Sequence, residues 1–292
     1  MSKVKIITDS NSGITQKQGK DLGIIVIPMP FTIDGEEYLE DISITQEKFY
    51  EFLSNNANVT TSQPSQFYLQ ELWEETLKEY DEIIYIPMSS GLSGTCANAT
   101  ALANNYNGKV FVVDNTRISI TQKNSVFDAL YLLEQGKSAK EIKDYLESDK
   151  YTSIYIVPST LKYLKKGGRI TSTAAALGTI LRIKPILYSD GGSFEKLAIT
   201  INIGQAKKKM IQQVKQDLET KFKSQYESGK MVFGVAHTQN EAEALKFKDE
   251  ILASIPNIKF SDLDTLSLSV SCHIGPGAIA VAIYPKLDQS NL

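Results

Sequence analysis

Short apolar runs rich in β-branched residues alternate with amphipathic segments in the first half of the chain. The apolar runs predict strands over Val4–Thr8, Ile24–Pro28, Ile83–Pro87 and Val110–Asp114. An extended segment with a turn at Asp34-Gly35 is expected over Phe31–Tyr38. Helical spacing predicts helices over Thr15–Leu22, Thr45–Leu53, Thr121–Glu134 and Ser138–Glu147, and one running through Trp73 to Tyr80. This alternation is typical of a parallel sheet with helices on both faces.

The pattern changes in the second half of the chain. Strands are predicted over Ser153–Val157, Pro185–Tyr188, Glu195–Ile201, Met231–Ala236, Leu266–Ser269 and Ala278–Tyr284. Helices are predicted over Leu161–Lys166, Thr173–Leu181, Gln205–Phe222 and Asn240–Ile255. Because two of the strands flank Gly191-Gly192 as in a hairpin, this half should contain a mixed sheet. We therefore expect two α/β domains, residues 1–155 and 156–292.

Composition narrows the class of protein. A chain of 292 residues with 42% hydrophobic and 22% charged residues is typical of a soluble globular protein. The net charge of −3 argues against nucleic acid as the main partner. The first residues have too short an apolar core for a signal peptide, and no apolar run is long enough to span a bilayer. We expect a cytoplasmic protein.

The residues that could bind a metal or a cofactor are few. Cys96 and Cys272 have no metal-type spacing, and they are expected to be buried thiols in a reducing compartment. The only histidines, His237 and His273, are isolated. Two isolated histidines form a poor ligand set, so the sequence predicts no metal and no cofactor.

The polar loop Ser89–Thr95 follows a predicted strand and precedes an alanine-rich helix. Its glycines, its hydroxyls and the first-turn amides of the helix are suited to an anion. No lysine follows the second glycine, so the loop is not a nucleoside-triphosphate loop, and it also lacks the dinucleotide fingerprint. Neutral donors fit a single carboxylate better. Alternatively, the hydroxyls only cap the helix, and composition does not decide between the two.

Other polar loops should lie near this one. Asp9-Ser10 and Thr61-Ser62 are expected to gather with Ser89–Thr95 beyond the carboxyl ends of the strands. The segment Gly91–Thr95 partly matches the G-x-S-x-G elbow of serine hydrolases, with Thr95 in place of the last glycine. A hydrolase that uses Ser93 and His273, with Asp9 orienting a histidine, is therefore an alternative.

A glycine-rich turn is expected to place His273 just before a strand. Its imidazole is either satisfied by backbone groups or a donor aimed at the same cleft as Ser93. For His237, which ends a strand, we favour a histidine satisfied by backbone groups. Basic residues form a further cluster, which is either a solvated face or a surface for an acidic or phosphate-bearing partner. Its members are Lys165, Lys166, Arg169, Arg182 and Lys184.

Several motifs occur in a characteristic order over essentially the whole chain. They are Ile7–Ser10, Thr61–Ser65, Ser89–Thr95, Lys166–Ile170, Ile183–Leu187 and His273–Ala278. With them the chain resembles the DegV family of bacterial fatty-acid-binding proteins, which includes the FakB subunits of fatty acid kinase. The resemblance implies a Rossmann-like first domain with a parallel sheet and a second α/β domain with a mixed six-stranded sheet. A long-chain fatty acid would lie in a tunnel between the domains.

The resemblance also implies roles for individual residues. Thr61, Ser93 and His273, with loop amides near Gly94, would hold the carboxylate, and Ser62, Ser90 and Thr95 would line its site. The protein itself would not be an enzyme. It would present the carboxylate to an ATP-binding kinase subunit that makes acyl phosphate for phospholipid synthesis.

The resemblance further implies that basic residues of the Lys165–Arg169 turn dock the kinase partner, namely Lys165, Lys166 and Arg169. Transient contact with a membrane is also expected. In one respect the chain departs from kinase-partnered members. No arginine precedes Lys207 in the stretch Thr200–Lys209, where many of those members carry an arginine-rich segment.

Overall fold

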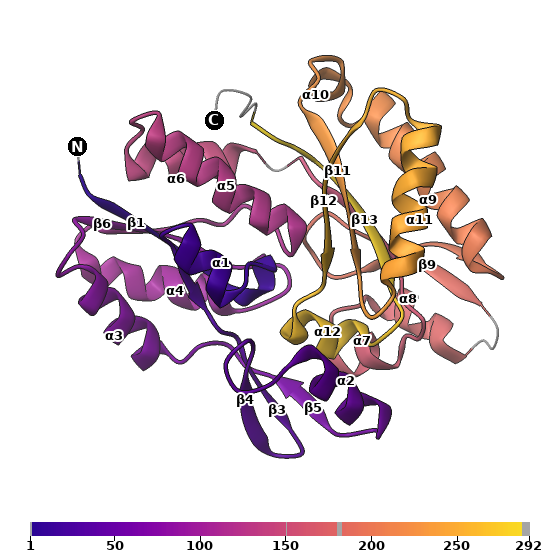
Figure 1. The fold of residues 1–292 in the computed structure, drawn as a ribbon, viewed down its shortest axis with the longest axis horizontal. Helices are drawn as coiled ribbons and strands as arrows, with labels where there is room; N and C mark the ends of the chain where they lie inside the picture. Colours follow the sequence, from indigo (N-terminus) through magenta and orange to yellow (C-terminus); the bar gives the residue numbers. More distant parts are fainter. Residues whose placement is uncertain (1, 150, 180–182, 288–292) are drawn as a thin grey trace. The chain divides into compact units, whose positions relative to one another are not determined.

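The computed structural model describes residues 2–149, 151–179 and 183–287, which form two compact units. Unit 1 comprises Met1–Lys150 and the short segment Ser267–Ser269. Unit 2 comprises Tyr151–Leu266 and Val270–Leu292. Both units combine helices with strands (Figure 1). The chain therefore crosses between the units three times along its length.

A parallel four-stranded sheet forms the centre of unit 1, as the alternating pattern predicted. Its strand order is β2 (Ile25–Ile27), β1 (Val4–Asp9), β6 (Glu82–Ile86) and β7 (Val110–Val112). Helices α5 (Ile120–Glu134) and α6 (Ala139–Ser148) share one buried core with Ile6 and Ile84. Helices α3 (Gln66–Thr76) and α4 (Thr95–Ala103) share the other core with Ile7 and Tyr85. Successive strand residues thus face opposite cores, so both faces of the sheet are covered.

A second, antiparallel sheet in unit 1 has the order β4 (Glu36–Leu39), β3 (Pro30–Ile33) and β5 (Val59–Thr61). The predicted turn at Asp34-Gly35 is confirmed, and both residues have positive φ (50° and 94°). Thr61 was expected in a polar loop, and this expectation was wrong, because Thr61 belongs to β5, which pairs with β3. Thr61 therefore ends a strand of this small sheet and does not lie at the edge of the parallel sheet.

The remaining elements of unit 1 are short. They are α1 (Gln16–Asp21), α2 (Gln46–Ser54) and 3-10 helices over Ser10–Ser12 and Asn104–Tyr106. At the start of α6, the Ser138 hydroxyl accepts from the Glu141 amide, and the Glu141 carboxylate accepts from the Ser138 amide. This reciprocal capping box satisfies two backbone donors that an isolated helix end would leave unpaired.

Unit 2 contains the mixed six-stranded sheet that the resemblance implied. The order is β10 (Glu195–Thr200), β9 (Lys184–Ser189), β8 (Ser153–Val157), β13 (Ile279–Pro285), β11 (Met231–His237) and β12 (Lys259–Thr265). Only the β11–β12 pair of this sheet is parallel. Helices α9 (Ile203–Glu219) and α11 (Glu241–Ser254) share a buried core with β11, including Met210, Phe233 and Phe247. The predicted β9–β10 hairpin is confirmed.

Two predictions in unit 2 need correction. The strand expected over Leu266–Ser269 was wrong, because the strand is β12 (Lys259–Thr265) and helix α12 spans Leu268–Ile274. The hydrophobic pattern did not predict β12, because it is a polar edge strand with few apolar residues. The helix expected over Thr173–Leu181 is split into α8 (Ser172–Ala175) and a 3-10 helix over Ala176–Thr179. Its last predicted residues, Ile180 and Leu181, and also Arg182 of the basic cluster, lie outside the described residues.

Two further short helices complete unit 2, α7 (Lys162–Gly167) and α10 (Lys223–Glu227). The helix predicted over Gln205–Phe222 ends at Glu219. Within the described ranges, no helix combines the length and the apolar character that crossing a bilayer requires.

Candidate functional site

The loop Ser89–Thr95 is a compact turn organised by its first residue. The backbone oxygen of Ser89 accepts hydrogen bonds from the Leu92 and Ser93 amides, both at 3.1 Å. The Ser89 hydroxyl accepts from the Gly91 amide at 3.1 Å. The Ser89 amide itself donates to the backbone oxygen of Arg117 at 2.8 Å. The loop therefore has a defined shape before α4 begins at Thr95.

Ser93 and Gly94 lie at the start of α4. The Ser93 hydroxyl is half-buried, lies 2.9 Å from the Thr95 hydroxyl and accepts from the Thr95 amide at 3.2 Å. Ser93 thus takes part in capping, as the alternative interpretation required. Across the part of the chain that the structure describes, the Gly94 amide donates to no backbone oxygen. The amide is thus available to a bound anion at the positive end of the helix.

The segment after β5 reaches this loop. Thr61 is half-buried at the end of β5, and the Ser62 amide donates to the Pro30 oxygen at 3.1 Å. The side-chain oxygen of Gln63 lies 3.4 Å from the point that a β-carbon on Gly94 would occupy. Unit 1 thus brings the Thr61–Ser65 motif against the Ser89–Thr95 motif, although they belong to different sheets. Ser62 and Ser90 are exposed, whereas Thr95 is buried.

Asp9 is fully buried next to the start of the Ser89–Thr95 loop. One carboxylate oxygen accepts from the Met88 amide at 3.0 Å, and the other accepts from the Asn11 amide and the Gln122 side chain, both at 3.1 Å. Burial raises the pKa of Asp9, although these hydrogen bonds oppose the change. Asp9 therefore ties together the segments that follow β1 and β6. In the hydrolase alternative Asp9 would orient a histidine, but both of its oxygens already accept these hydrogen bonds.

His273 lies in the last turn of α12 in unit 2, and the glycine-rich turn follows it. The expectation that His273 itself lies in this turn just before a strand was wrong, because His273 is helical. The turn contains Gly275 and Gly277, with φ of 77° and 81°, and β13 begins at Ile279. A β-carbon on Gly167 would lie only 1.9 Å from Nδ1 of His273. Glycine at position 167 therefore leaves room for the imidazole ring. This close approach explains one glycine of the Lys166–Ile170 motif.

Arg169 completes the surroundings of His273. Its guanidinium donates to the Gly167 oxygen at 2.5 Å. Burial, together with the positive charge of Arg169, lowers the pKa of His273 to about 4. The imidazole is therefore neutral near pH 7, with one N–H donor. A neutral histidine suits hydrogen bonding to a carboxylate better than it suits a general base with a pKa near the working pH.

The other sequence candidates have mainly structural partners. The side chain of His237 accepts from the Asn240 amide at 3.3 Å, and its backbone oxygen accepts from the Leu266 amide at 2.8 Å, as expected. Lys165 and Lys166 are exposed in the last turn of α7, where the helix dipole favours cations. Within the described residues, no cluster of three His, Cys, Asp or Glu side chains could hold a metal.

Both cysteines are buried, as the sequence indicated. Burial is the main cause that raises the pKa of Cys96 to about 11, so this thiol stays protonated. Sequence reasoning missed three buried polar side chains near the loops, Glu40, Arg117 and Gln122. The polar residues of the segment Ile120–Ser125 could have indicated Gln122, whereas no comparable sequence feature marks Glu40 and Arg117.

Comparison with known proteins gives a consistent result over the whole chain. The sequence model described as "Uncharacterised protein, DegV family" matches residues 3–286. Protein DegV of Bacillus subtilis is 30% identical over 282 residues, which cover 95% of this chain and 98% of the relative. A DegV domain-containing protein of Staphylococcus aureus (strain N315) is 30% identical over 287 residues, which cover 98% and 100%.

Solved structures show the same similarity. A DegV family protein from Thermus thermophilus, described with fatty acid binding, has a TM-score of 0.84 at 27% identity and covers 97% of this chain and 99% of its own. DegV from Bacillus subtilis, described as a fatty acid binding protein, has a TM-score of 0.82 at 28% identity, with coverage of 98% and 100%. The fold is therefore shared along the full length.

Proposed function

The chain belongs to the DegV family, and we propose that it binds a long-chain fatty acid by its carboxylate and performs no chemistry on it. One observation carries this proposal. Two solved structures that match this chain over almost their entire length are described as fatty-acid-binding. The cation-free loop Ser89–Thr95 supports it, because neutral donors suit a single carboxylate.

The proposed carboxylate donors are the Thr61 and Ser93 hydroxyls, the Gly94 amide and the imidazole N–H of His273. A carboxylate is only an acceptor when ionised, so it needs such donors when it leaves water. Ser62, Ser90 and Thr95 are secondary candidates. An acyl tail contributes about 0.8 kcal/mol per buried methylene, or on the order of 10 kcal/mol for a long chain before the costs of binding. Tight binding, with lipid that co-purifies, is expected.

Mass spectrometry of the freshly purified, denatured protein tests the proposal. A fatty acid should be released, and delipidated protein should take up palmitate. Thr61→Ala with Ser93→Ala should weaken retention, whereas Thr60→Ala is the matched control. Thr60 bonds the Thr32 hydroxyl at 2.6 Å within the small sheet and has no proposed role at the ligand. Protein that is free of lipid and also refuses palmitate would exclude fatty acid binding.

Full retention in the double variant would instead exclude only the assigned donors. In that case fatty acid binding would stand, and the carboxylate would have to be held by other groups. The two outcomes can be told apart because the first is measured on the wild-type protein and the second on the variants.

The finer part of the proposal concerns a partner. The protein presents the carboxylate to an ATP-binding fatty acid kinase subunit, which transfers a phosphoryl group from ATP to a carboxylate oxygen. Lys165 and Lys166 are exposed and could meet an acidic partner surface, and Arg169 lies beside them. The missing arginine before Lys207 makes the test necessary.

Reconstitution with such a subunit tests this finer proposal directly. ATP-dependent formation of acyl phosphate from bound palmitate is expected, and Lys165→Glu with Lys166→Glu should abolish it without loss of palmitate binding. Lys140→Glu, an exposed lysine on α6 of unit 1, is the control. Turnover that is unaffected by the double charge reversal would refute this docking surface.

A further inference from the structure

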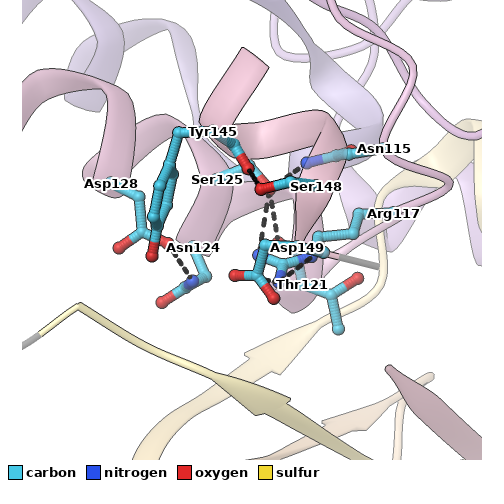
Figure 2. A network of polar contacts seen from close by, with 9 residues as sticks. All are labelled: Asn115, Arg117, Thr121, Asn124, Ser125, Asp128, Tyr145, Ser148 and Asp149. Carbon is cyan, nitrogen blue, oxygen red and sulfur yellow. Dashed lines mark hydrogen bonds and ion pairs between the residues drawn. The ribbon is translucent and has the colours of Figure 1, made fainter. Parts of the chain in front are cut away.

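Arg117 is the centre of a buried polar network in unit 1 (Figure 2). Its side chain is 0% exposed, and Nη2 donates to the Asp149 carboxylate at 3.1 Å and to the Asp149 backbone oxygen at 3.2 Å. Nη1 donates to the Ser125 hydroxyl at 3.2 Å, and the side-chain amide of Asn115 donates to the same hydroxyl at 2.7 Å. A buried ion pair is weak evidence for stability, but it can fix a local conformation of the chain.

The backbone of Arg117 contacts the proposed ligand loop. Its backbone oxygen accepts the Ser89 amide at 2.8 Å, and Ser89 in turn organises the turn up to Ser93. Two residues later, the Ser119 amide donates to the Asn11 oxygen at 3.0 Å. The segment Asn115–Ser119 thus supports both the loop after β1 and the loop after β6.

This supporting segment has an unusual backbone on both sides of Arg117. Thr116 has φ of 58° and Ser119 has φ of 55°. Positive φ is unfavourable for residues with a side chain, and most of all for a β-branched residue such as Thr116. Such a conformation persists only where surrounding contacts impose it, and the buried ion pair of Arg117 is one such contact within this segment.

The other partner of the ion pair marks the end of unit 1. Asp149 caps the C-terminus of α6, where its amide donates to the Tyr145 oxygen at 3.2 Å. The chain then enters unit 2 at Tyr151. The network therefore connects the start of the ligand loop with the segment at which unit 1 ends.

From this geometry we infer that Arg117 is a positioning residue for carboxylate recognition. Its ion pair with Asp149 imposes the strained backbone of Asn115–Ser119, and the Arg117 backbone oxygen then sets the position of Ser89 and the donors that follow it. The inference rests on the proposed fatty acid binding. It predicts that loss of the ion pair impairs recognition of the carboxylate and leaves the contribution of the acyl tail intact.

Equilibrium dialysis with labelled palmitate and with labelled hexadecanol separates the two contributions, because hexadecanol has the tail without the carboxylate. Asp149→Asn and Arg117→Gln should raise the Kd for palmitate by roughly tenfold, the size of one lost hydrogen bond to a charged group. The Kd for hexadecanol should change by less than about twofold. Arg117→Lys should restore part of the palmitate affinity that Arg117→Gln loses, since lysine retains the charge but not the forked donors.

Val126→Ala is the matched control, because Val126 is fully buried on α5 in the core of the same unit and is not part of the network. It should reduce stability without changing the preference for palmitate over hexadecanol. If Arg117→Gln does not fold, Asp149→Asn and Ser125→Ala provide the same comparison. An unchanged preference in the folded variants would overturn the role of Arg117. Failure of the wild-type protein to bind palmitate would instead overturn the proposed function.

Discussion

The carboxylate of Glu40 should make the stability of unit 1 depend on pH, and Glu40→Gln should remove this dependence. The side chain is 5% exposed. One of its oxygens accepts from the Leu268 amide at 2.5 Å, and the other accepts from the Ser10 hydroxyl at 2.9 Å. Glu40 thereby holds the returning segment Ser267–Ser269 at the start of α12. Burial raises the pKa of Glu40 to about 8 from 4.5, and the negative charge of Asp41 adds to it.

The direction of the effect follows from proton binding. Between pH 4.5 and about 8 the folded protein holds a proton on Glu40 that the unfolded chain has lost. The stabilisation is therefore fully present below pH 4.5 and is lost as the pH rises to about 8. Since one pKa unit corresponds to about 1.4 kcal/mol, the interval of 8 − 4.5 gives an upper bound of roughly 5 kcal/mol.

Urea unfolding at several pH values measures this effect. The difference in unfolding free energy between wild type and Glu40→Gln isolates Glu40, since every other titrating group occurs in both proteins. The difference should favour the wild type progressively less between pH 5 and pH 9, by several kcal/mol in total. Asp41→Asn is the control, and most of the pH dependence should persist in it. A difference that stays constant over this range would refute the assignment of a buried, protonated carboxyl to Glu40.

Two further predictions concern His273 and Ser93. Gly167→Ala should displace the imidazole of His273 and weaken palmitate binding at least about tenfold by equilibrium dialysis, because the added carbon would lie 1.9 Å from Nδ1. Gly192→Ala, where the nearest atom is 3.8 Å from the added carbon, should bind normally, and equal losses in both would contradict the steric argument. A fluorophosphonate probe should not label Ser93, because Asp9 is already engaged by three donors; labelling together with esterase turnover would restore the hydrolase.

Local features could be predicted because they depend on residues close together in the sequence. The parallel strands of unit 1 were visible as apolar runs, and the helix predicted over Ser138–Glu147 is confirmed as α6. The Ser89–Thr95 loop was also identified from residue types alone. Periodicity and turn chemistry act over a few residues, so they are accessible without the fold.

Strands that depend on distant partners could not be predicted in the same way. β5 is a strand because its backbone pairs with β3, although the residues around Thr61 indicated a polar loop. β12 is a polar edge strand whose position is determined by β11. In both cases the hydrogen bonds to a neighbouring strand outweigh a weak local preference.

The chemistry of the candidate site shows the same division. The sequence by itself determined that neutral donors, and no lysine, occupy the Ser89–Thr95 loop. Only the tertiary structure decided that Arg117 supports Ser89, that Gly167 makes room for His273 and that Glu40 is buried. The reason is physical: the pKa of a buried group, the cost of a close contact and the strength of an ion pair depend on neighbours that only the folded chain brings together.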